Sequence, residues 1–248
     1  MVENFRFSRL PQIIFGNGKI ADLPGIISVY RGEAIIVRGK ESLDTNPVWA
    51  ETTISLAKQG ITPGYFEIPT EPSVSMIDDL MTEVKKSLPK VIVAVGGGSV
   101  MDAGKAISAM ATVEGSVKDY LEGVGTMTHR GTKIPFIAVP TTAGTGSEAT
   151  KNAVISQTGK SGFKRSLRHE NFVPDIAIVD PLMSVYCSKE ITAASGMDCF
   201  TQLTEAFLST SSSPYTDALA FEGLRASERS NARMDSGYRS LPARAMPR

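Results

Sequence analysis

The sequence predicts an α/β fold in which a parallel β-sheet carries helices on both of its faces. Short apolar segments rich in Val, Ile and Phe alternate along the chain with longer amphipathic segments. The most apolar of them, residues 91–95, breaks into three glycines and restarts with helical spacing. Hydrophobic residues make up 42% of the 248 and charged residues 21%, which is typical of a globular protein with a buried core.

Each expected element follows from its own pattern. Strands are expected where apolar and β-branched residues cluster between turn residues, at 12–15, 34–37, 65–68, 91–95, 136–139 and 176–179. Helices are expected where apolar residues recur at helical spacing, at 47–59, 73–87 and 99–112, with a short one near 117–122. Residues 153–157 and 163–167 flank a glycine-containing turn, which favours a hairpin.

Charge and composition exclude several classes of partner. Lys plus Arg and Asp plus Glu both number 26, so the chain has no net charge that favours nucleic acid or an anionic membrane. The first residues lack the apolar core of a signal peptide, and no apolar run is long enough to span a bilayer. Cys187 and Cys199 do not make a disulfide framework. We therefore expect a cytoplasmic protein with no nucleic-acid and no membrane partner.

The glycines after residues 91–95 predict an anion site. Gly96, Gly97 and Gly98 leave no Cβ at the end of the strand, so a bulky anion can contact the backbone. Ser99, followed three residues later by Asp102, is typical of a helix-capping pair. Free amides at the start of a helix bind phosphate. The alternative is a tight turn whose glycines serve packing only.

A second polar loop follows residues 136–139. Its sequence at 140–148, Pro-Thr-Thr-Ala-Gly-Thr-Gly-Ser-Glu, supplies hydroxyl groups and unhindered amides that suit a pyrophosphate, a ribose or a carboxamide. Taken alone, it fits a polar loop ending in helix caps equally well. Two such loops after two strands of one sheet favour a dinucleotide site.

A further helix is expected at 191–208. Asp198 and Gln202 are four residues apart and therefore share one face of it. By spacing alone, the pair is a surface carboxylate and amide.

Together these segments resemble the iron-containing (group III) alcohol dehydrogenases, a family within the wider dehydroquinate-synthase-like fold. The motifs that carry the resemblance are Gly-Gly-Gly-Ser-x-x-Asp at 96–102, Thr-Thr-x-Gly-Thr-Gly-Ser-Glu at 141–148, and the segments 174–181 and 196–205. It covers residues from about Phe5 to about Arg225. The second motif argues against a glycerol-dehydrogenase- or dehydroquinate-synthase-like activity.

The resemblance implies a Rossmann-like dinucleotide-binding domain followed by an all-helical domain. It also implies NAD(P)-dependent interconversion of a small primary alcohol and its aldehyde, assisted by a divalent metal. Lys164 matches the family lysine that reaches the cofactor ribose, although by itself it fits an exposed hairpin lysine. The other implied cofactor residues are Gly97, Gly98 and Ser99 for the pyrophosphate, Asp102 near the nicotinamide, and Thr141, Thr142 and Thr145 for the phosphate and ribose.

The turn after residues 34–37 bears on the choice between NAD and NADP. Family members that prefer NAD usually carry an aspartate there, which binds the adenosine ribose and repels a 2′-phosphate. Gly39 takes that place in this chain. Arg38, Lys40 and Ser42 are candidate phosphate donors, although the acidic residue among them partly offsets their charge. We expect NADP(H) to be preferred over NAD(H); the alternative is a solvated turn with incidental charge.

The metal site implied by the resemblance is incomplete. The family binds Fe(II), or Zn(II), through one aspartate and three histidines, and the metal acts as a Lewis acid on the substrate oxygen. Asp198 matches that aspartate, whereas Gln202 stands at the first histidine position, and a neutral amide is a poor ligand beside imidazole. His129 and His169 match no ligand position. No catalytic residue is assigned.

We therefore expect three regions: a dinucleotide-binding domain at 1–184, the start of a helical metal-binding domain at 185–225, and a divergent, disordered tail at 226–248. The tail has no apolar periodicity, which indicates a reading-frame change or a truncated gene, with a basic partner-binding tail as the alternative. Residues after about 184 are expected to be loosely held.

Two functions of different classes stay open. The first is the family's metal-dependent, NAD(P)-linked alcohol dehydrogenase activity. The second is a catalytically inactive remnant that retains only nucleotide binding. By analogy with the family, residues 4–7 are a candidate strand for pairing in a homodimer.

Overall fold

The computed structural model describes residues 4–39, 43–160 and 162–235. The chain divides into two compact units. One is Phe7–Ser188, and the other comprises Met1–Arg6 and Lys189–Arg248. Both glycine-containing loops lie in the first unit, so that unit carries the candidate site.

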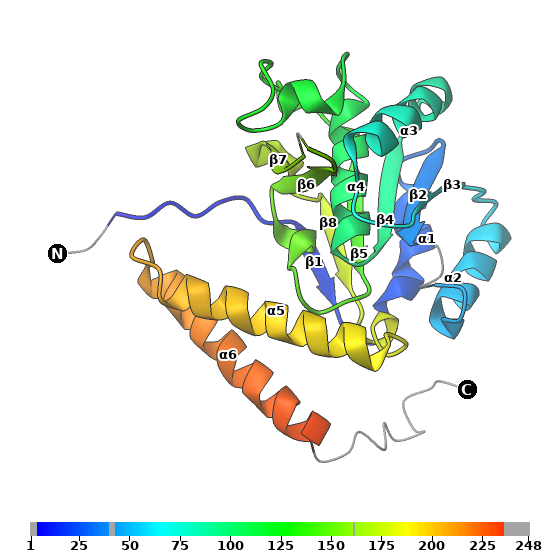
Figure 1. Cartoon of the computed structure of the whole chain (residues 1–248). Coiled ribbons are helices and arrows are strands. Elements are labelled where there is room, and N and C mark those ends of the chain that lie inside the picture. The colour runs from blue at the N-terminus through cyan, green and yellow to red at the C-terminus, as the bar shows by residue number, and fades with distance from the viewer. Residues whose placement is uncertain (1–3, 40–42, 161, 236–248) are drawn as a thin grey trace. The chain divides into compact units, whose positions relative to one another are not determined.

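The first unit is built on a six-stranded sheet with the order β1-β8-β5-β4-β2-β3, in which every pair of neighbours is parallel (Figure 1). All six predicted strands are present, several of them slightly longer than expected. The α/β class and the parallel sheet are confirmed. The strands are β1 (Gln12–Phe15), β2 (Ala34–Gly39), β3 (Gly64–Ile68), β4 (Val91–Gly96), β5 (Phe136–Pro140) and β8 (Ile176–Val179).

The helices between the strands match the predictions except at two places. Leu23–Ser28 forms a short helix, α1, that the sequence did not predict; Pro24 lies in its first turn, where proline is tolerated, whereas Gly25 lowers its helix propensity. The helix forms because its residues Leu23 and Ile27 are buried in the apolar core. The region near 117–122 is a 3₁₀ turn that begins with a capping box. The longer helices are α2 (Pro47–Lys58), α3 (Val74–Ser87) and α4 (Gly98–Met110).

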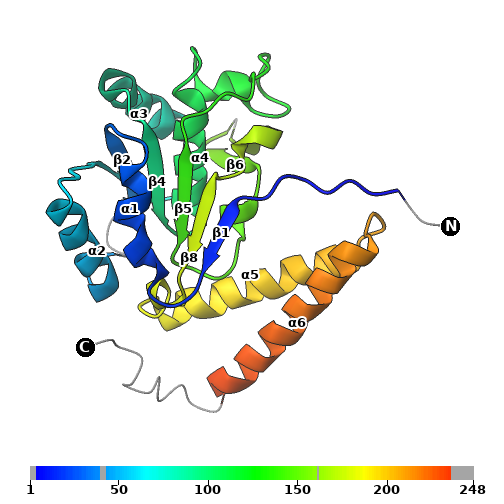
Figure 2. The same ribbon diagram turned by 180° about the vertical axis from the view of Figure 1, so that it is seen from behind.

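The sheet separates two apolar cores, and β4 contributes to both. Val91, Val93 and Val95 lie in the core that includes residues of α1 and α2. Ile92 and Ala94 lie in the core that includes residues of α3 and α4. Because β4 is buried on both faces, its sequence is continuously apolar rather than alternating. Figures 1 and 2 show the sheet from its two sides, with helices over each.

The predicted hairpin is confirmed. β6 (Asn152–Gln157) and β7 (Phe163–Arg168) pair antiparallel, apart from the main sheet. Ala153 and Ile155 reach into the core beside α4. The backbone N–H of Ser156 donates to the carbonyl of Pro72 at 2.9 Å, which fixes the hairpin to the segment after β3.

The second unit contains α5 (Lys189–Phe207) and α6 (Pro214–Asp235). The helix expected at 191–208 is therefore present. Gly223 of α6 lies against Leu203 of α5, but α5 has no fully buried side chain. Large apolar side chains that stay exposed in this unit are Ile191, Met197, Phe200, Phe207, Leu208, Leu219 and Phe221.

The tail differs from the expectation. α6 continues beyond Arg225 to Asp235, so residues 226–235 are helical where disorder was expected. This stretch contains neither Gly nor Pro, so nothing local ends the helix after Arg225. Residues 236–248 lie outside the described residues. Within the described ranges, no helix combines the length and the apolar character needed to cross a bilayer.

Candidate functional site

The first loop joins β4 to α4. β4 ends at Gly96 and α4 begins at Gly98, so Gly97 is the N-cap residue, and no side chain caps the helix. Within the described part of the chain, no acceptor binds the backbone N–H groups of Gly98 and Ser99. Unpaired N–H groups at the positive end of a helix are suited to bind an anion.

Ser99 is not the capping residue, contrary to the expectation from sequence. It follows Gly98 as the second helical residue. Asp102 lies within the helix, where its Oδ1 accepts a hydrogen bond from Ser147 Oγ at 2.8 Å. The helix starts earlier because Gly97 already has the extended backbone of an N-cap residue, with φ −80° and ψ −169°. Glycine is accepted at that position without a capping side chain.

The two loops touch, which explains why the first one needs glycine. A Cβ atom on Gly98 would lie 2.8 Å from Thr145 Cγ2, and one on Gly97 would lie 3.4 Å from the side chain of Thr142. Because β4 and β5 are neighbours and end at the same level, both loops leave the sheet side by side. The loops therefore form one surface.

The second loop presents hydroxyl groups to that surface. Thr141 is buried, and its N–H donates to the carbonyl of Gly96 at 3.0 Å. Thr142 is half-buried and Thr145 is exposed. Thr145 Oγ1 accepts from the N–H of Ser147 at 3.2 Å, which orders the end of the loop. Threonine hydroxyls and helix-start amides thus meet at the carboxyl ends of neighbouring strands, where sheets of this type bind ligands.

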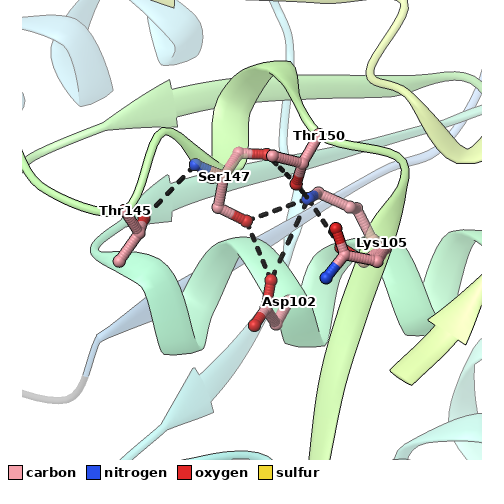
Figure 3. Close-up of polar contacts among 6 residues, drawn as sticks. Asp102, Lys105, Thr145, Ser147 and Thr150 are labelled. Atoms are coloured by element: carbon pink, nitrogen blue, oxygen red, sulfur yellow. Dashed lines mark hydrogen bonds and ion pairs between the residues drawn. The ribbon is translucent and has the colours of Figure 1, made fainter. Parts of the chain in front are cut away.

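A buried lysine behind the loops was missed by sequence reasoning. Lys105 of α4 is only 2% exposed. Its Nζ donates to Ser147 Oγ at 2.9 Å, to Thr150 Oγ1 at 2.7 Å and to the carbonyl of Asn152 at 2.9 Å (Figure 3). The available signal in the sequence was a lysine within a run of small and apolar residues, 103–111.

Lys105 and Asp102 influence each other's ionisation. Burial lowers the pKa of Lys105 to about 8, against the opposing attraction of Asp102 and Glu148. Burial raises the pKa of Asp102, against the opposing effects of Lys105 and the Ser147 hydrogen bond. The atoms Lys105 Nζ and Asp102 Oδ1 are 3.9 Å apart. Each charge therefore offsets part of the desolvation of the other.

Lys164 lies on β7 and reaches Glu71 in the segment after β3. It is exposed, and its Nζ donates to Glu71 Oε1 at 2.6 Å. Glu71 also accepts from Ser156 Oγ at 2.9 Å, and the two hydrogen bonds lower the pKa of Glu71. The structure thus gives Lys164 an acidic partner that the sequence analysis did not include.

Gly39 is the last residue of β2. Arg38 precedes it and forms ion pairs with Asp44 and Glu67. Lys40 and Ser42, which were expected to assist a phosphate, lie outside the described residues. Of the features proposed for NADP recognition, the structure therefore describes Gly39 and Arg38 alone.

The expected metal residues lie in the second unit. Asp198 of α5 is half-buried and Gln202 is exposed. Among the described residues, no three His, Cys, Asp or Glu side chains come together as metal ligands would. The donor set that the structure describes around Asp198 therefore does not fit an Fe(II) or Zn(II) site.

The two histidines have structural partners in the first unit. His129 is buried, its Nδ1 accepts from the N–H of Gly131 at 2.9 Å, and burial lowers its pKa. His169 Nδ1 accepts from the N–H of Asn171 at 3.1 Å. The Nδ1 atom of each histidine therefore accepts a backbone hydrogen bond that orders the loop following it.

With this geometry established, comparison with known proteins identifies the family. The family model for iron-containing alcohol dehydrogenases matches residues 11–181, which include both loops. The chain belongs to the iron-containing alcohol dehydrogenase family. The resemblance seen in the two motifs is therefore confirmed.

Relatives within the iron-containing alcohol dehydrogenases match part of their own length. Long-chain-alcohol dehydrogenase 1 of Geobacillus thermodenitrificans is 36% identical over 166 residues, which is 67% of this chain and 41% of that protein. The 1,3-propanediol dehydrogenase of Citrobacter freundii is 36% identical over 176 residues, 71% of this chain and 44% of that protein. The chain thus covers less than half of these two relatives.

A solved structure supports the same fold. The sulfoacetaldehyde reductase of Bifidobacterium kashiwanohense in complex with NAD⁺ is 30% identical and superposes with a TM-score of 0.78, covering 88% of this chain and 57% of that one. The Rossmann-like architecture predicted from the sequence is thereby confirmed.

Proposed function

We propose that this chain binds a nicotinamide dinucleotide on the surface formed by residues 97–99 and 141–147, which we call the cradle. The observation that carries the proposal is the pair of unpaired N–H groups of Gly98 and Ser99 beside the hydroxyl groups of Thr142 and Thr145. The helix start suits a pyrophosphate, and the hydroxyl groups suit the ribose and phosphate. The NAD⁺ complex of a structural neighbour supports the choice of ligand.

Within this proposal, Asp102 lies near the nicotinamide and Lys164 near a ribose. Asp102 is on the helix that begins at the cradle, and its charge interacts with that of Lys164. In the described structure Lys164 donates a hydrogen bond to Glu71. When the dinucleotide binds, Lys164 therefore changes its hydrogen-bond partner from the Glu71 carboxylate to a ribose hydroxyl. Thr141 supports the second loop from a buried position.

The direct test is calorimetric titration of the purified chain with NADPH and NADH. Saturable binding at one site supports the proposal. Folded protein that takes up neither dinucleotide at millimolar concentration rejects it.

We further propose that NADP(H) is preferred over NAD(H). Gly39 ends β2 without a carboxylate, so nothing at that position repels a 2′-phosphate. Asp44 and Glu67 neutralise part of the charge of Arg38, so the preference rests mainly on the missing repulsion. The ratio of the dissociation constants for NADPH and NADH tests this preference. Tighter binding of NADH overturns the proposal.

For the reaction, we propose interconversion of a small primary alcohol and its aldehyde by hydride exchange with the nicotinamide. Membership of the iron-containing alcohol dehydrogenase family supports this class of chemistry. Asp198 is the one proposed metal ligand of the described chain. Because the described donor set does not fit the metal, we derive no step through it.

A second candidate function is dinucleotide binding without turnover. Gln202, a neutral amide at the position of a family histidine, favours it. Metal analysis and an alcohol oxidation assay, with and without added Fe(II) or Zn(II), distinguish the two. Turnover stimulated by metal supports the dehydrogenase, and binding without turnover supports the second candidate.

We also propose a cytoplasmic homodimer, paired near the N-terminus. Residues 4–7, the pairing strand expected from the sequence, form no strand in the structure, and the edge strand nearest to them is β1. Its residues Ile13 and Phe15 are 53% and 69% exposed. An unpaired edge with apolar side chains favours pairing with another strand. Sedimentation analysis tests the assembly, and a monomer at all concentrations contradicts it.

A further inference from the structure

We propose that Lys105 is a positioning residue that holds the two loops of the cradle against each other and keeps Asp102 ionised behind them. The inference rests on the proposed dinucleotide function. It concerns a buried residue that meets the cradle only from behind, through Ser147.

Lys105 has a complete set of acceptors. An ammonium group carries three N–H bonds, and oxygen atoms of Ser147, Thr150 and Asn152 accept them at 2.7–2.9 Å. Lys105 belongs to α4, the helix that starts in the first loop. Its acceptors belong to the segment that ends the second loop and to β6. One side chain therefore ties the two halves of the cradle together (Figure 3).

The direction of the hydrogen bonds around Ser147 favours an ionised Asp102, since a charged acceptor binds a donor more strongly than a neutral one. Ser147 Oγ accepts from Lys105, so its single proton is free to be donated to Asp102 Oδ1 at 2.8 Å. Asp102 is then an acceptor, as a carboxylate is. A side chain without N–H groups at position 105 removes both the donor to Ser147 and the nearby positive charge.

The effect reaches the ligand surface through two contacts. The N–H of Ser147 donates to Thr145 Oγ1, and Thr145 Cγ2 lies against the backbone of Gly98. A shift of Ser147 therefore moves Thr145 relative to the amides of the first loop. The charged groups that act on this network are Asp102 on α4, Glu148 beside Ser147 and Lys164 on β7.

The experiment compares four variants of the full chain with the unaltered protein. Lys105→Met keeps the length and removes the charge, Lys105→Arg keeps the charge, and Ser147→Ala breaks the connection to Asp102. Lys58→Met is the matched control, because Lys58 is exposed near the end of α2. The readouts are the dissociation constant for NADPH and the titration midpoint of the Asp102 carboxyl carbon by ¹³C NMR.

We expect Lys105→Met to weaken NADPH binding by about tenfold or more and to raise the Asp102 midpoint. Lys105→Arg should restore the midpoint at least in part, and Lys58→Met should change neither readout. Ser147→Ala should raise the midpoint while leaving Lys105 in place. A role in folding alone would not move the midpoint in a protein that stays folded.

The proposal is overturned if Lys105→Met changes neither the dissociation constant nor the midpoint. If Lys105→Met does not fold, Ser147→Ala decides, and an unchanged midpoint in that variant overturns the proposal. If the unaltered protein binds no dinucleotide, the proposed function fails, but the Asp102 midpoint still reports whether Lys105 keeps the carboxylate charged.

Discussion

The backbone of Gly98 touches the side chain of Thr145, so closely that a Cβ atom on Gly98 would lie 2.8 Å from Thr145 Cγ2. The first residue of α4 and the middle of the second loop thus share one surface. Any side chain at Gly98 must displace Thr145 or occupy the space in front of the helix amides.

We therefore predict that Gly98→Val weakens binding of NADPH by about tenfold or more, because the new methyl groups exclude a phosphate from the helix start. Calorimetric titration measures the effect. Gly25→Val is the control, because Gly25 is exposed on α1 and a Cβ there meets no atom within 4 Å. Equal affinity in the unaltered chain and Gly98→Val would show that the phosphate lies elsewhere.

The low pKa of Lys105 predicts how stability depends on pH. Burial lowers its pKa from 10.5 to about 8, so between these values the unfolded chain binds more protons than the folded one. The contribution of Lys105 to the free energy of unfolding should therefore rise with pH across this window, by on the order of 3 kcal/mol.

Urea denaturation of the unaltered protein and Lys105→Met, at a series of pH values, isolates this contribution as a difference. Titrating groups that Lys105 does not influence cancel in that difference. A flat difference between pH 8 and 10.5 would mean that Lys105 titrates normally in the folded state.

Gly39→Asp should reverse the cofactor preference. A carboxylate at the end of β2 accepts from the ribose hydroxyls of NADH and repels the 2′-phosphate of NADPH. We expect the ratio of the dissociation constants to shift toward NADH by about tenfold or more. Gly39→Asn, similar in size but neutral, is the control for shape. An unchanged ratio in Gly39→Asp would place the adenosine ribose away from β2.

Asp180→Ala should destabilise the first unit. Asp180 is 2% exposed, and its two oxygens accept from the N–H groups of Ile20 and Leu182, each at 3.0 Å. Removing the carboxylate leaves two N–H groups without an acceptor, which costs about 2–4 kcal/mol in the free energy of unfolding. Thermal or urea denaturation measures it. Asp22→Ala, at an exposed position, should cost less than about 0.5 kcal/mol, and equal losses would refute the explanation.

Limited proteolysis should separate the two units. α5 has no fully buried side chain, and Lys189 begins the second unit. Brief trypsin treatment is expected to cut near Lys189 and leave a resistant fragment that corresponds to Phe7–Ser188, identified by mass spectrometry. The same experiment would contradict the expectation if α5 and α6 resisted cleavage as long as the sheet does.

The sequence was a good guide to the sheet and a poorer one to the start of α4. Residues 91–95 are apolar because β4 is buried on both faces, and that pattern is visible without a structure. The cap at Ser99 was wrong because the helix begins at Gly98. Helix starts depend on backbone geometry that a motif of side chains describes only approximately.

α1 and Lys105 show where local patterns fail. Leu23 and Ile27 stabilise α1 despite the low helix propensity of Gly25, because burial favours the helix more than propensity opposes it. Lys105 is an ordinary helix residue by sequence. Its significance depends on acceptors that only folding brings to its ammonium group.

The sequence by itself determined the α/β class, the six parallel strands, the hairpin, the family and the two polar loops, because periodicity and glycine content are local properties of the chain. Tertiary structure alone decided that the loops touch, that Lys164 meets Glu71 and that Lys105 meets Ser147 and Thr150. These contacts join residues far apart in sequence, and their strength depends on how much water the fold removes around them.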